Sequence, residues 1–279
     1  MVCYTKCMLV TVDTGGTKTL VAGFYRDGSM ADDVVKFPTP KDQNEYIGLL
    51  KDTIKEKFGN EKLEALVVAL PGIIRKGVAV WCSNLGWKNF NAQEVLERTF
   101  PNVPITIEND ANLAGLAETR ILDPVPVSSL YVTISTGIGT GVITNGHIDP
   151  GLRHSEGGHA LVEFQGEMRE WESFASGRAI YRDFGKFGSE ITDPQTWQQV
   201  ADRISRGFLA VIPIIQPDVI IIGGSIGEYF EKYNRQLEAI LQEKLPPHIS
   251  CPRFKEAEHP SHAVLYGCYY YALDSLTDR

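Results

Sequence analysis

Apolar residues along the chain fall into short runs separated by glycine-containing turns, and this pattern predicts alternating strands and helices. Residues 8–13 ("MLVTVD") and 63–70 ("LEALVVAL") are typical of strands. Between these segments, apolar side chains recur at helical spacing at Leu50, Ile54 and Phe58. The pattern therefore predicts an α/β fold.

The same pattern continues through the rest of the chain. Further strands are expected at 20–25, 33–37, 73–81 (as a hairpin), 103–108, 129–135, 142–144 and 217–224. Helices are expected at 91–99, 111–120, 176–184, 195–212, 226–244 and 262–276.

Two stretches in different halves of the chain resemble each other. Residues 8–28 and 129–147 both show an apolar strand, a Thr-Gly turn, a second strand and an Asp-Gly or Asn-Gly turn. This repeat predicts two copies of one unit, and hence two lobes facing a cleft. We expect a small N-terminal lobe of residues 1–121 with the C-terminal helix 262–279, and a large lobe of residues 122–261. The Pro-rich stretch 122–129 is the expected crossover.

Composition and charge limit the classes of function that the protein could have. Hydrophobic residues make up 43% and charged residues 22%, the profile of a soluble globular protein. The net charge of −8 argues against a nucleic-acid partner, which would require a basic face. No apolar run reaches the length of a membrane span, and the first ten residues lack the apolar core of a signal peptide. We therefore expect a cytoplasmic protein without a membrane partner.

Three polar residues stand where an expected strand meets an expected helix. In "TIENDANLAG" (106–115), these are Glu108, Asn109 and Asp110. Taken alone, they predict a helix cap, because Asn and Asp side chains accept hydrogen bonds from the free N–H groups of a first turn. Two carboxylates beside an amide could also be catalytic.

Three glycine-rich turns could bind phosphate, because their backbone N–H groups can point into one concavity. The first, "DTGGTKT", follows Asp13, whose carboxylate could hold the waters of a Mg²⁺ ion. The second is "STGIGTG" and the third "IIIGGSIG". Each alone could be an ordinary turn. None matches a P-loop or a dinucleotide fingerprint, so Lys18 is not a P-loop lysine.

Together these motifs resemble a known family. "DTGGTKT", "IENDANLAGLAE", "STGIGTGVITNG", "EGGH", "ESFASGRAI" and "PDVIIIGG" occur in the order and spacing of the ROK family of bacterial sugar kinases and repressors. That family belongs to the sugar kinase, actin and heat-shock chaperone superfamily. The resemblance implies two ribonuclease-H-like lobes, each with a five-stranded sheet, and ATP, Mg²⁺ and a hexose as ligands.

The resemblance also implies roles for individual residues. Asp110 matches the catalytic base that accepts the proton of the attacking sugar hydroxyl. The sugar-binding positions correspond to Asn84, Asn109, Asp110, Glu156, His159 and Glu172. The nucleotide and its metal ion correspond to Asp13, Gly15, Gly16, Thr17, Lys18, Thr136, Gly137, Gly139, Thr140, Gly223 and Gly224.

The sequence departs from the family after His159. Many ROK proteins have a cysteine-rich zinc loop there, but "ALVEFQGEMREW" contains no cysteine. A closed structural zinc site needs thiolate ligands, so we expect no zinc. The loop must then be ordered by packing, for which Phe164, Trp171 and Phe174 are candidates. The first strand begins near Met8, so no N-terminal DNA-binding domain is expected.

The resulting functional prediction is a glucokinase-like, ATP-dependent hexose kinase that acts on O6 of glucose, and we expect a homodimer. Close alternatives are a polyphosphate-dependent glucokinase, an N-acetylhexosamine kinase and a fructokinase. A non-catalytic sugar sensor is a different class, and a filament protein of the same superfamily is a third. The presence of Asp110 favours an enzyme, because a sensor needs no base.

Overall fold

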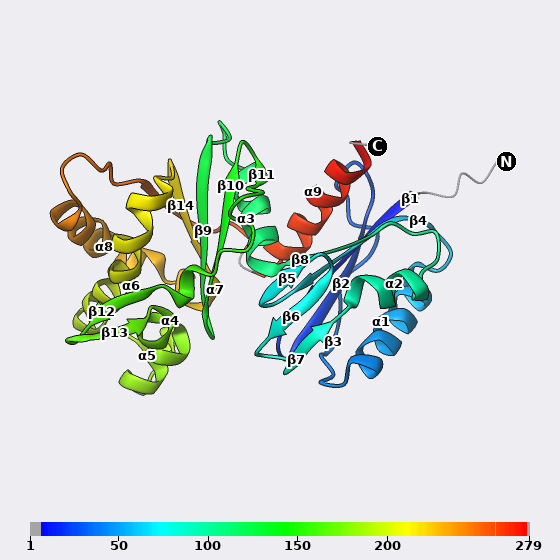
Figure 1. Cartoon of the computed structure of the whole chain (residues 1–279), viewed down its shortest axis with the longest axis horizontal. Coiled ribbons are helices and arrows are strands. Elements are labelled where there is room, and N and C mark those ends of the chain that lie inside the picture. Colours follow the sequence, from blue (N-terminus) through cyan, green and yellow to red (C-terminus); the bar gives the residue numbers. More distant parts are fainter. Residues whose placement is uncertain (1–6, 260, 278–279) are drawn as a thin grey trace. The chain divides into compact units, whose positions relative to one another are not determined.

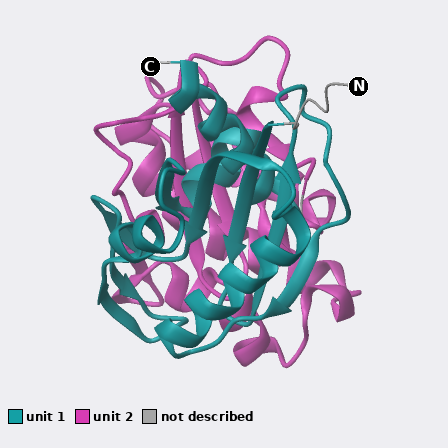
Figure 2. Ribbon diagram, turned by 90° about the vertical axis from the view of Figure 1, so that its right-hand side faces the viewer, with its two compact units in different colours: residues 1–117, 262–279 teal, residues 118–261 magenta. Residues whose placement is uncertain are grey.

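The computed structural model describes residues 7–259 and 261–277. The chain divides into two compact units, residues 1–117 with 262–279 (unit 1) and residues 118–261 (unit 2) (Figure 2). The division after residue 117 falls within the helix α3 (Asp110–Arg120), whereas the sequence suggested a crossover at 122–129. Each unit has its own sheet and its own hydrophobic core.

Unit 1 is built on a five-stranded sheet. Its strand order is β3 (Val35–Pro38), β2 (Lys18–Phe24), β1 (Cys7–Thr14), β4 (Lys62–Leu70) and β8 (Ile105–Asn109). The first three strands pair antiparallel, and β1, β4 and β8 pair parallel. The carboxyl ends of these three parallel strands therefore lie at one edge of the sheet.

Helices cover both faces of this sheet. The helices α1 (Gln43–Phe58) and α2 (Ala92–Thr99) pack on the face that carries Met8, Val10 and Val12. On the other face, α9 (Ala263–Thr277) contacts β1 and β4. A small antiparallel sheet extends the unit, with strands β5 (Ile73–Arg75), β6 (Val78–Cys82) and β7 (Trp87–Phe90).

Unit 2 repeats the same sheet (Figure 1). Its strand order is β11 (His147–Ile148), β10 (Ile138–Thr144), β9 (Ser128–Ile134), β14 (Val219–Gly223) and β15 (Arg253–Glu256). Again the first three strands pair antiparallel and the last three parallel. The identical order and direction confirm the repeated unit and the α/β fold that the sequence predicts.

The core of unit 2 lies between its sheet and two long helices. The helices α6 (Pro194–Ile215) and α8 (Phe230–Lys244) bury their apolar side chains against β9 and β14. Shorter elements surround this core. They are a 3₁₀ turn (Gly157–His159), β12 (Leu161–Phe164), β13 (Glu167–Glu170), α4 (Glu172–Ala175), α5 (Gly177–Phe184), a second 3₁₀ turn (Gly188–Glu190) and α7 (Gly224–Gly227).

Two details differ from the sequence-based expectation. The segment 226–244 is not one helix, because α7 ends at Gly227 and α8 begins at Phe230. The cysteine-free segment after His159 forms the hairpin β12–β13, closed by Gln165 and Gly166, both with positive φ. Among the described residues, no helix combines the length and apolar character needed to cross a membrane.

Candidate active site

The strand register in unit 1 brings two candidate carboxylates to the same edge of the sheet. Asp13 of β1 pairs with Ala69 of β4, and Ala69 pairs with Glu108 of β8. Asp110 follows two residues after Glu108 and begins α3. Ligand sites of open α/β sheets form at the carboxyl ends of parallel strands, so this edge is the candidate site of unit 1.

Asn109 caps helix α3, as the sequence predicts for this junction. Its Oδ1 accepts a hydrogen bond from the backbone N–H of Asn112 at 3.0 Å, and its Nδ2 donates to the carbonyl of Gly72 at 2.9 Å. Glu108 is buried, and its Oε1 accepts bonds from the backbone N–H of Asn109 at 2.8 Å and from Nδ2 of Asn112 at 3.0 Å. These bonds fix the start of α3 and hence the backbone that carries Asp110.

Asp110 is partly buried at the first position of α3. Its Oδ1 accepts a hydrogen bond from the backbone N–H of Ala111 at 2.8 Å. Burial raises the pKa of the neighbouring Cys82 thiol to about 12, and the negative charge of Asp110 contributes to this rise. The side chain is therefore held at the helix start, beside the β5–β6–β7 sheet that contains Cys82.

The first glycine turn is joined to the turn that carries Asn84. The turn closes where the backbone N–H of Gly15 donates to the carbonyl of Lys18 at 2.9 Å. A Cβ on Gly16 would lie 3.1 Å from Cβ of Asn84, so the two turns touch. Nζ of Lys41 donates to the carbonyls of Gly16 at 3.0 Å and Asn84 at 2.6 Å. Sequence reasoning missed Lys41, because a lysine before a helix carries no motif.

Asp13 has the most clearly shifted pKa among the carboxylates at this edge of the unit 1 sheet. Desolvation raises its pKa from 3.8 to about 6, and the positive charge of Lys18 opposes the rise. Below pH 6 the side chain of the metal-free protein therefore holds a proton that an exposed aspartate would have lost. A protonated carboxyl is a poor partner for a hydrated Mg²⁺ ion.

We predict a specific pH dependence from this shift. As pH rises from 4 through 6, Asp13 must ionise in a buried place, so the free energy of unfolding of the metal-free protein should fall by up to about 3 kcal/mol. Over the same range Mg²⁺ affinity should increase if Asp13 corresponds to the metal-associated position of the family, because an ionised carboxylate attracts a cation. Denaturant titrations at several pH values, with and without Mg²⁺, measure both trends. The variant Asp13→Asn should lose both, and unchanged trends in that variant would contradict the assignment.

In unit 2, Glu172 lies directly against the second glycine turn. Its Oε2 accepts a hydrogen bond from the backbone N–H of Ile138 at 3.1 Å. A Cβ on Gly137 would lie only 2.6 Å from the same oxygen, so glycine is needed for this close approach. Oγ1 of Thr140 accepts a bond from the backbone N–H of Gly157 at 3.0 Å, which ties the "EGGH" segment to β10.

The "EGGH" segment brings two more candidate residues to Glu172. Nδ1 of His159 lies 3.4 Å from Oε2 of Glu170. Burial raises the pKa of Glu156, the charge of His159 lowers it, and the charge of Glu172 raises it, so these three groups interact. The side chains predicted from "EGGH" and "WESFASG" therefore form one polar cluster within unit 2.

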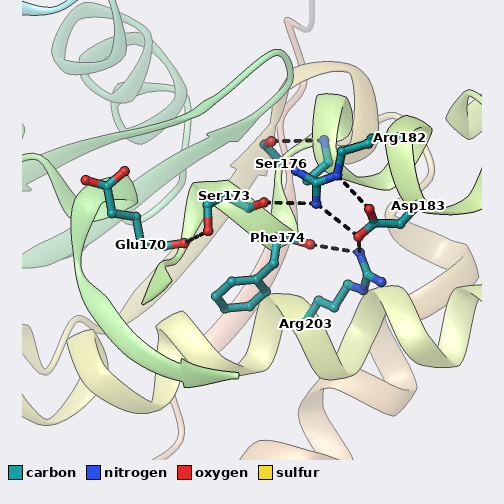
Figure 3. A network of polar contacts seen from close by, with 8 residues as sticks. Glu170, Ser173, Phe174, Ser176, Arg182, Asp183 and Arg203 are labelled. Carbon is teal, nitrogen blue, oxygen red and sulfur yellow. Dashed lines mark hydrogen bonds and ion pairs between the residues drawn. The ribbon is translucent and has the colours of Figure 1, made fainter. Parts of the chain in front are cut away.

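Helix α4, which begins with Glu172, is anchored by an arginine–aspartate network (Figure 3). Nη1 of Arg203 donates to the carbonyl of Phe174 at 3.0 Å and to Oδ2 of Asp183 at 2.7 Å. Arg182 donates to Oδ1 of Asp183 at 2.6 Å and to the carbonyl of Ser173 at 3.2 Å. The two guanidinium groups lower the pKa of Asp183. This network connects α4, α5 and α6 through one carboxylate.

Aromatic side chains anchor the cysteine-free segment by packing into the core of unit 2. Trp171 and Phe174 are completely buried, and Phe164 is nearly so. The rings of Phe164 and Phe174 stack with their centroids 4.2 Å apart, and Trp171 packs edge-on against Phe208. The three aromatic residues that the sequence singles out are thus part of the core of unit 2.

The third glycine turn lies beside the second. Gly223 ends β14 and Gly224 begins α7, while Oγ of Ser225 donates to Oγ of Ser135 at 3.4 Å. A cavity of about 540 Å³ opens next to both turns. It lies within unit 2 and is lined by residues of the β9–β10 turn, α5, the turn around Gly188 and α7. Its volume is in the range of small-molecule sites.

A family model described as "ROK family" matches residues 9–275. The chain belongs to the ROK family. A polyphosphate glucokinase from Mycobacterium tuberculosis is 30% identical over 234 residues, which cover 81% of this chain and 81% of that protein. A fructokinase from Pediococcus pentosaceus is 26% identical over 264 residues, which cover 87% of each chain.

Solved structures agree with this membership. The crystal structure of a ROK hexokinase from Thermus thermophilus has a TM-score of 0.78 and 26% identity, covering 98% of this chain and 100% of that one. The relatives are mainly sugar kinases that differ in sugar, and a repressor also occurs among them. The predicted two-lobed, actin-like architecture is therefore confirmed at the level of the fold.

The sequence-predicted residues of this ROK protein fall into two sets. Those in unit 1 are Asp13, Gly15, Gly16, Thr17, Lys18, Asn84, Asn109 and Asp110; those in unit 2 are Thr136, Gly137, Gly139, Thr140, Glu156, His159, Glu172, Gly223 and Gly224. In unit 1 the contacts join Gly16 to Asn84, and in unit 2 they join Glu172 to Gly137. Glu156, His159 and Glu172 form the polar cluster. Thr17, Lys18 and Thr136 are exposed, as residues at the tips of turns.

The polar cluster also contains ligand atoms suited to a metal ion. One ligand atom each from His159, Glu170 and Glu172 lies within 4.8 Å of the others. Imidazole and carboxylate groups can bind zinc, but the sequence-based reason against zinc remains, since closed structural sites use thiolates. Glu170 was not among the predicted residues. The hairpin β12–β13 brings it to His159, and the sequence did not predict this hairpin.

We predict that the purified ROK protein contains no stoichiometric zinc. Elemental analysis after purification without chelator should give well under one zinc ion per chain, because the cluster offers no thiolate and its His159 and Glu170 are exposed. A comparison with His159→Ala distinguishes a site from contamination. One zinc per chain that disappears in this variant would contradict the prediction.

Proposed function

We propose that this ROK protein is an ATP-dependent kinase that transfers the γ-phosphoryl group to a hexose, with O6 of glucose as the acceptor. The observation that carries the proposal is the placement of Asp110. Its carboxylate stands at the first position of a helix whose start is fixed by Glu108 and Asn109. A general base needs such a fixed aim, because proton transfer depends on hydrogen-bond geometry.

The proposed reaction uses the residues of the chain in the following way. Asp110 accepts the proton of the sugar hydroxyl while that oxygen forms a bond to the γ-phosphorus. The bond between the γ-phosphorus and the oxygen bridging it to the β-phosphate breaks, and ADP leaves with that oxygen. Because the protein itself forms no covalent bond, positioning and electrostatics supply most of the rate.

Asp13 is the proposed partner of the Mg²⁺ ion that accompanies ATP. Its carboxylate fits this role, because Mg²⁺ retains several waters and is commonly held through one or two carboxylates. When bound, the ion neutralises charge on the phosphates. Asp13 would hold its waters, and in the neighbouring turn, which the Gly15–Lys18 bond closes, the backbone N–H of Gly16 would be offered to an anion.

The proposed sugar ligands are Asn84, Asn109, Glu156, His159 and Glu172. A hexose presents hydroxyl groups that both donate and accept hydrogen bonds, and amide, carboxylate and imidazole groups can satisfy them. Burial raises the pKa of Glu156, so this carboxyl holds its proton to a higher pH than an exposed glutamate does. A sugar that lacks an expected hydroxyl would leave these groups unpaired and be rejected.

Assays that combine several sugar acceptors with two phosphoryl donors test the proposed function. Glucose, mannose, fructose, N-acetylglucosamine and N-acetylmannosamine should each be assayed with ATP and with inorganic polyphosphate, following the sugar phosphate directly. We expect glucose with ATP to give the highest kcat/KM. Sugar binding without turnover for every pair would instead favour a sugar sensor, and turnover with polyphosphate alone would favour the polyphosphate glucokinase alternative, which the Mycobacterium relative represents.

A further inference from the structure

We propose that Tyr181 and Phe187 form the surface on which the base of a nucleotide donor stacks, while Arg178 faces its phosphates. The inference rests on the proposed kinase function and specifies the residues that select a nucleotide as donor. All three residues line the cavity of unit 2. None was chosen as a nucleotide ligand from the sequence.

The two aromatic rings form one exposed platform. Their centroids lie 4.3 Å apart with an interplanar angle of 22°, so the rings stack. Tyr181 is 45% exposed and Phe187 58% exposed, although large apolar side chains are usually buried. A flat heteroaromatic ring can extend such a stack, and this explains why two neighbouring aromatic faces border a cavity.

Helix α5 places a positive charge next to this platform. Arg178 and Tyr181 are three residues apart on α5, so their side chains lie on the same face of the helix. Among the described residues, none forms a hydrogen bond or ion pair with the Arg178 guanidinium, in contrast to Arg182 and Arg203, which bind Asp183. Arg178 is therefore available for an anionic ligand.

The polar end of the cavity complements a phosphate chain. Ser135, Thr136 and Ser225 contribute hydroxyl groups from the second and third glycine turns. The backbone N–H of Gly177, at the start of α5, donates to the carbonyl of Ser135 at 2.7 Å, so the hydroxyl-rich turn lies at the start of the helix and Tyr181 lies further along it. A nucleotide likewise has one anionic end and one flat aromatic end. Its volume of about 540 Å³ fits a ligand of this size.

The lining disfavours inorganic polyphosphate at this place. Arg178 is the only cation among the described lining residues, and Glu228 adds a carboxylate. A polyphosphate chain would need several cations along its length, and it has no surface that stacks on Tyr181 or Phe187. The platform is therefore a feature that selects the nucleoside part of the donor.

Alanine and aromatic substitutions at the platform test this inference. Tyr181→Ala and Phe187→Ala should each raise the KM for ATP about tenfold, the scale of one stacking contact, with kcat within about twofold. Tyr181→Phe and Phe187→Tyr should keep the parent KM, because they keep the ring. Ile214→Ala, at a position that is 81% exposed on α6, is the control and should change nothing.

Inhibition by ADP and by tripolyphosphate distinguishes binding of the nucleotide base from binding of the phosphates. In the platform variants, ADP should inhibit more weakly by the same factor, whereas inhibition by tripolyphosphate should be unchanged. Arg178→Ala should weaken inhibition by both compounds. Equal loss of ADP and tripolyphosphate inhibition in the platform variants, or an unchanged KM for ATP in both alanine variants, would overturn the inference.

Direct binding keeps this test separate from the proposed function. Calorimetric titration with a non-hydrolysable ATP analogue needs no turnover. If the protein binds the analogue, loses about tenfold affinity in Tyr181→Ala and phosphorylates no sugar, the platform stands and the kinase proposal fails. If sugar phosphorylation proceeds but analogue affinity is the same in all variants, the platform is wrong and the kinase proposal stands.

Discussion

Replacing Asp110 with asparagine is expected to lower kcat by a factor of about 10²–10⁴, the usual contribution of a general base. The substitution keeps the size of the side chain and an oxygen that can accept the 2.8 Å bond from the N–H of Ala111. It removes the ability to take the hydroxyl proton. Sugar affinity should stay measurable, because the other proposed sugar ligands, Asn84, Asn109 and those of unit 2, remain. Stopped assays for kcat and calorimetry for sugar binding give the two quantities.

The matched control for this variant is Asp193→Asn. Asp193 caps helix α6 through a 2.8 Å bond from the N–H of Thr196, so the same change of charge occurs at another helix start. It should leave kcat unchanged and lower stability only slightly, because an asparagine also caps a helix. If Asp110→Asn keeps near-normal kcat, Asp110 is not the base.

Replacing Trp171 with alanine should lower the free energy of unfolding of unit 2 by about 3–5 kcal/mol, the usual range for a buried tryptophan. Trp171 is completely buried, and its ring lies so close to Gly207 that a Cβ there would meet it at 1.9 Å. The cavity left behind could not close easily, because Gly207 has no side chain to fill it. Urea titration followed by circular dichroism measures the loss.

Trp171→Ala should also weaken sugar binding, because the proposed sugar ligand Glu172 is the next residue and begins α4. Trp171→Phe should be much milder, since Nε1 of Trp171 is buried without a hydrogen-bond partner in the described part of the chain. The control is Trp81→Ala, at a site 44% exposed in β6, with an expected cost below about 1 kcal/mol. Similar losses at both sites would contradict the role of Trp171 in ordering this segment.

The parts of the fold that the sequence predicts correctly are those whose pattern comes from burial. Strands β1, β4 and β14 are almost continuously apolar because helices cover one or both faces of the sheets to which these strands belong. β15 was missed, since its residues "RFKE" are mostly exposed at the edge of a sheet and show no apolar run. The hairpin β12–β13 was missed for a related reason: three of the four residues of β13 are exposed and the fourth is only partly buried.

The residues of the candidate site also fall into those that the sequence predicts and those that it does not. Residues carried by a motif, such as Asp110 and Glu172, can be chosen from the sequence, because turns with Gly, Asn or Asp mark strand ends. Lys41, Tyr181 and Phe187 cannot, because their importance comes from neighbours far away in the chain or on another element. The contact between Lys41 and Asn84 joins residues 43 positions apart, and no local pattern encodes it.

The repeated sheet has a consequence for how charge is divided between the halves of the chain. In the two matching segments, Thr11, Val12 and Asp13 of β1 correspond to Thr133, Ile134 and Ser135 at the end of β9. One half thus carries an ionisable carboxylate at the position where the other carries a neutral hydroxyl. A polyanion without a bound cation is repelled by the first and not by the second, so one residue difference at matching strand ends makes the two copies of the scaffold electrostatically unequal toward anions.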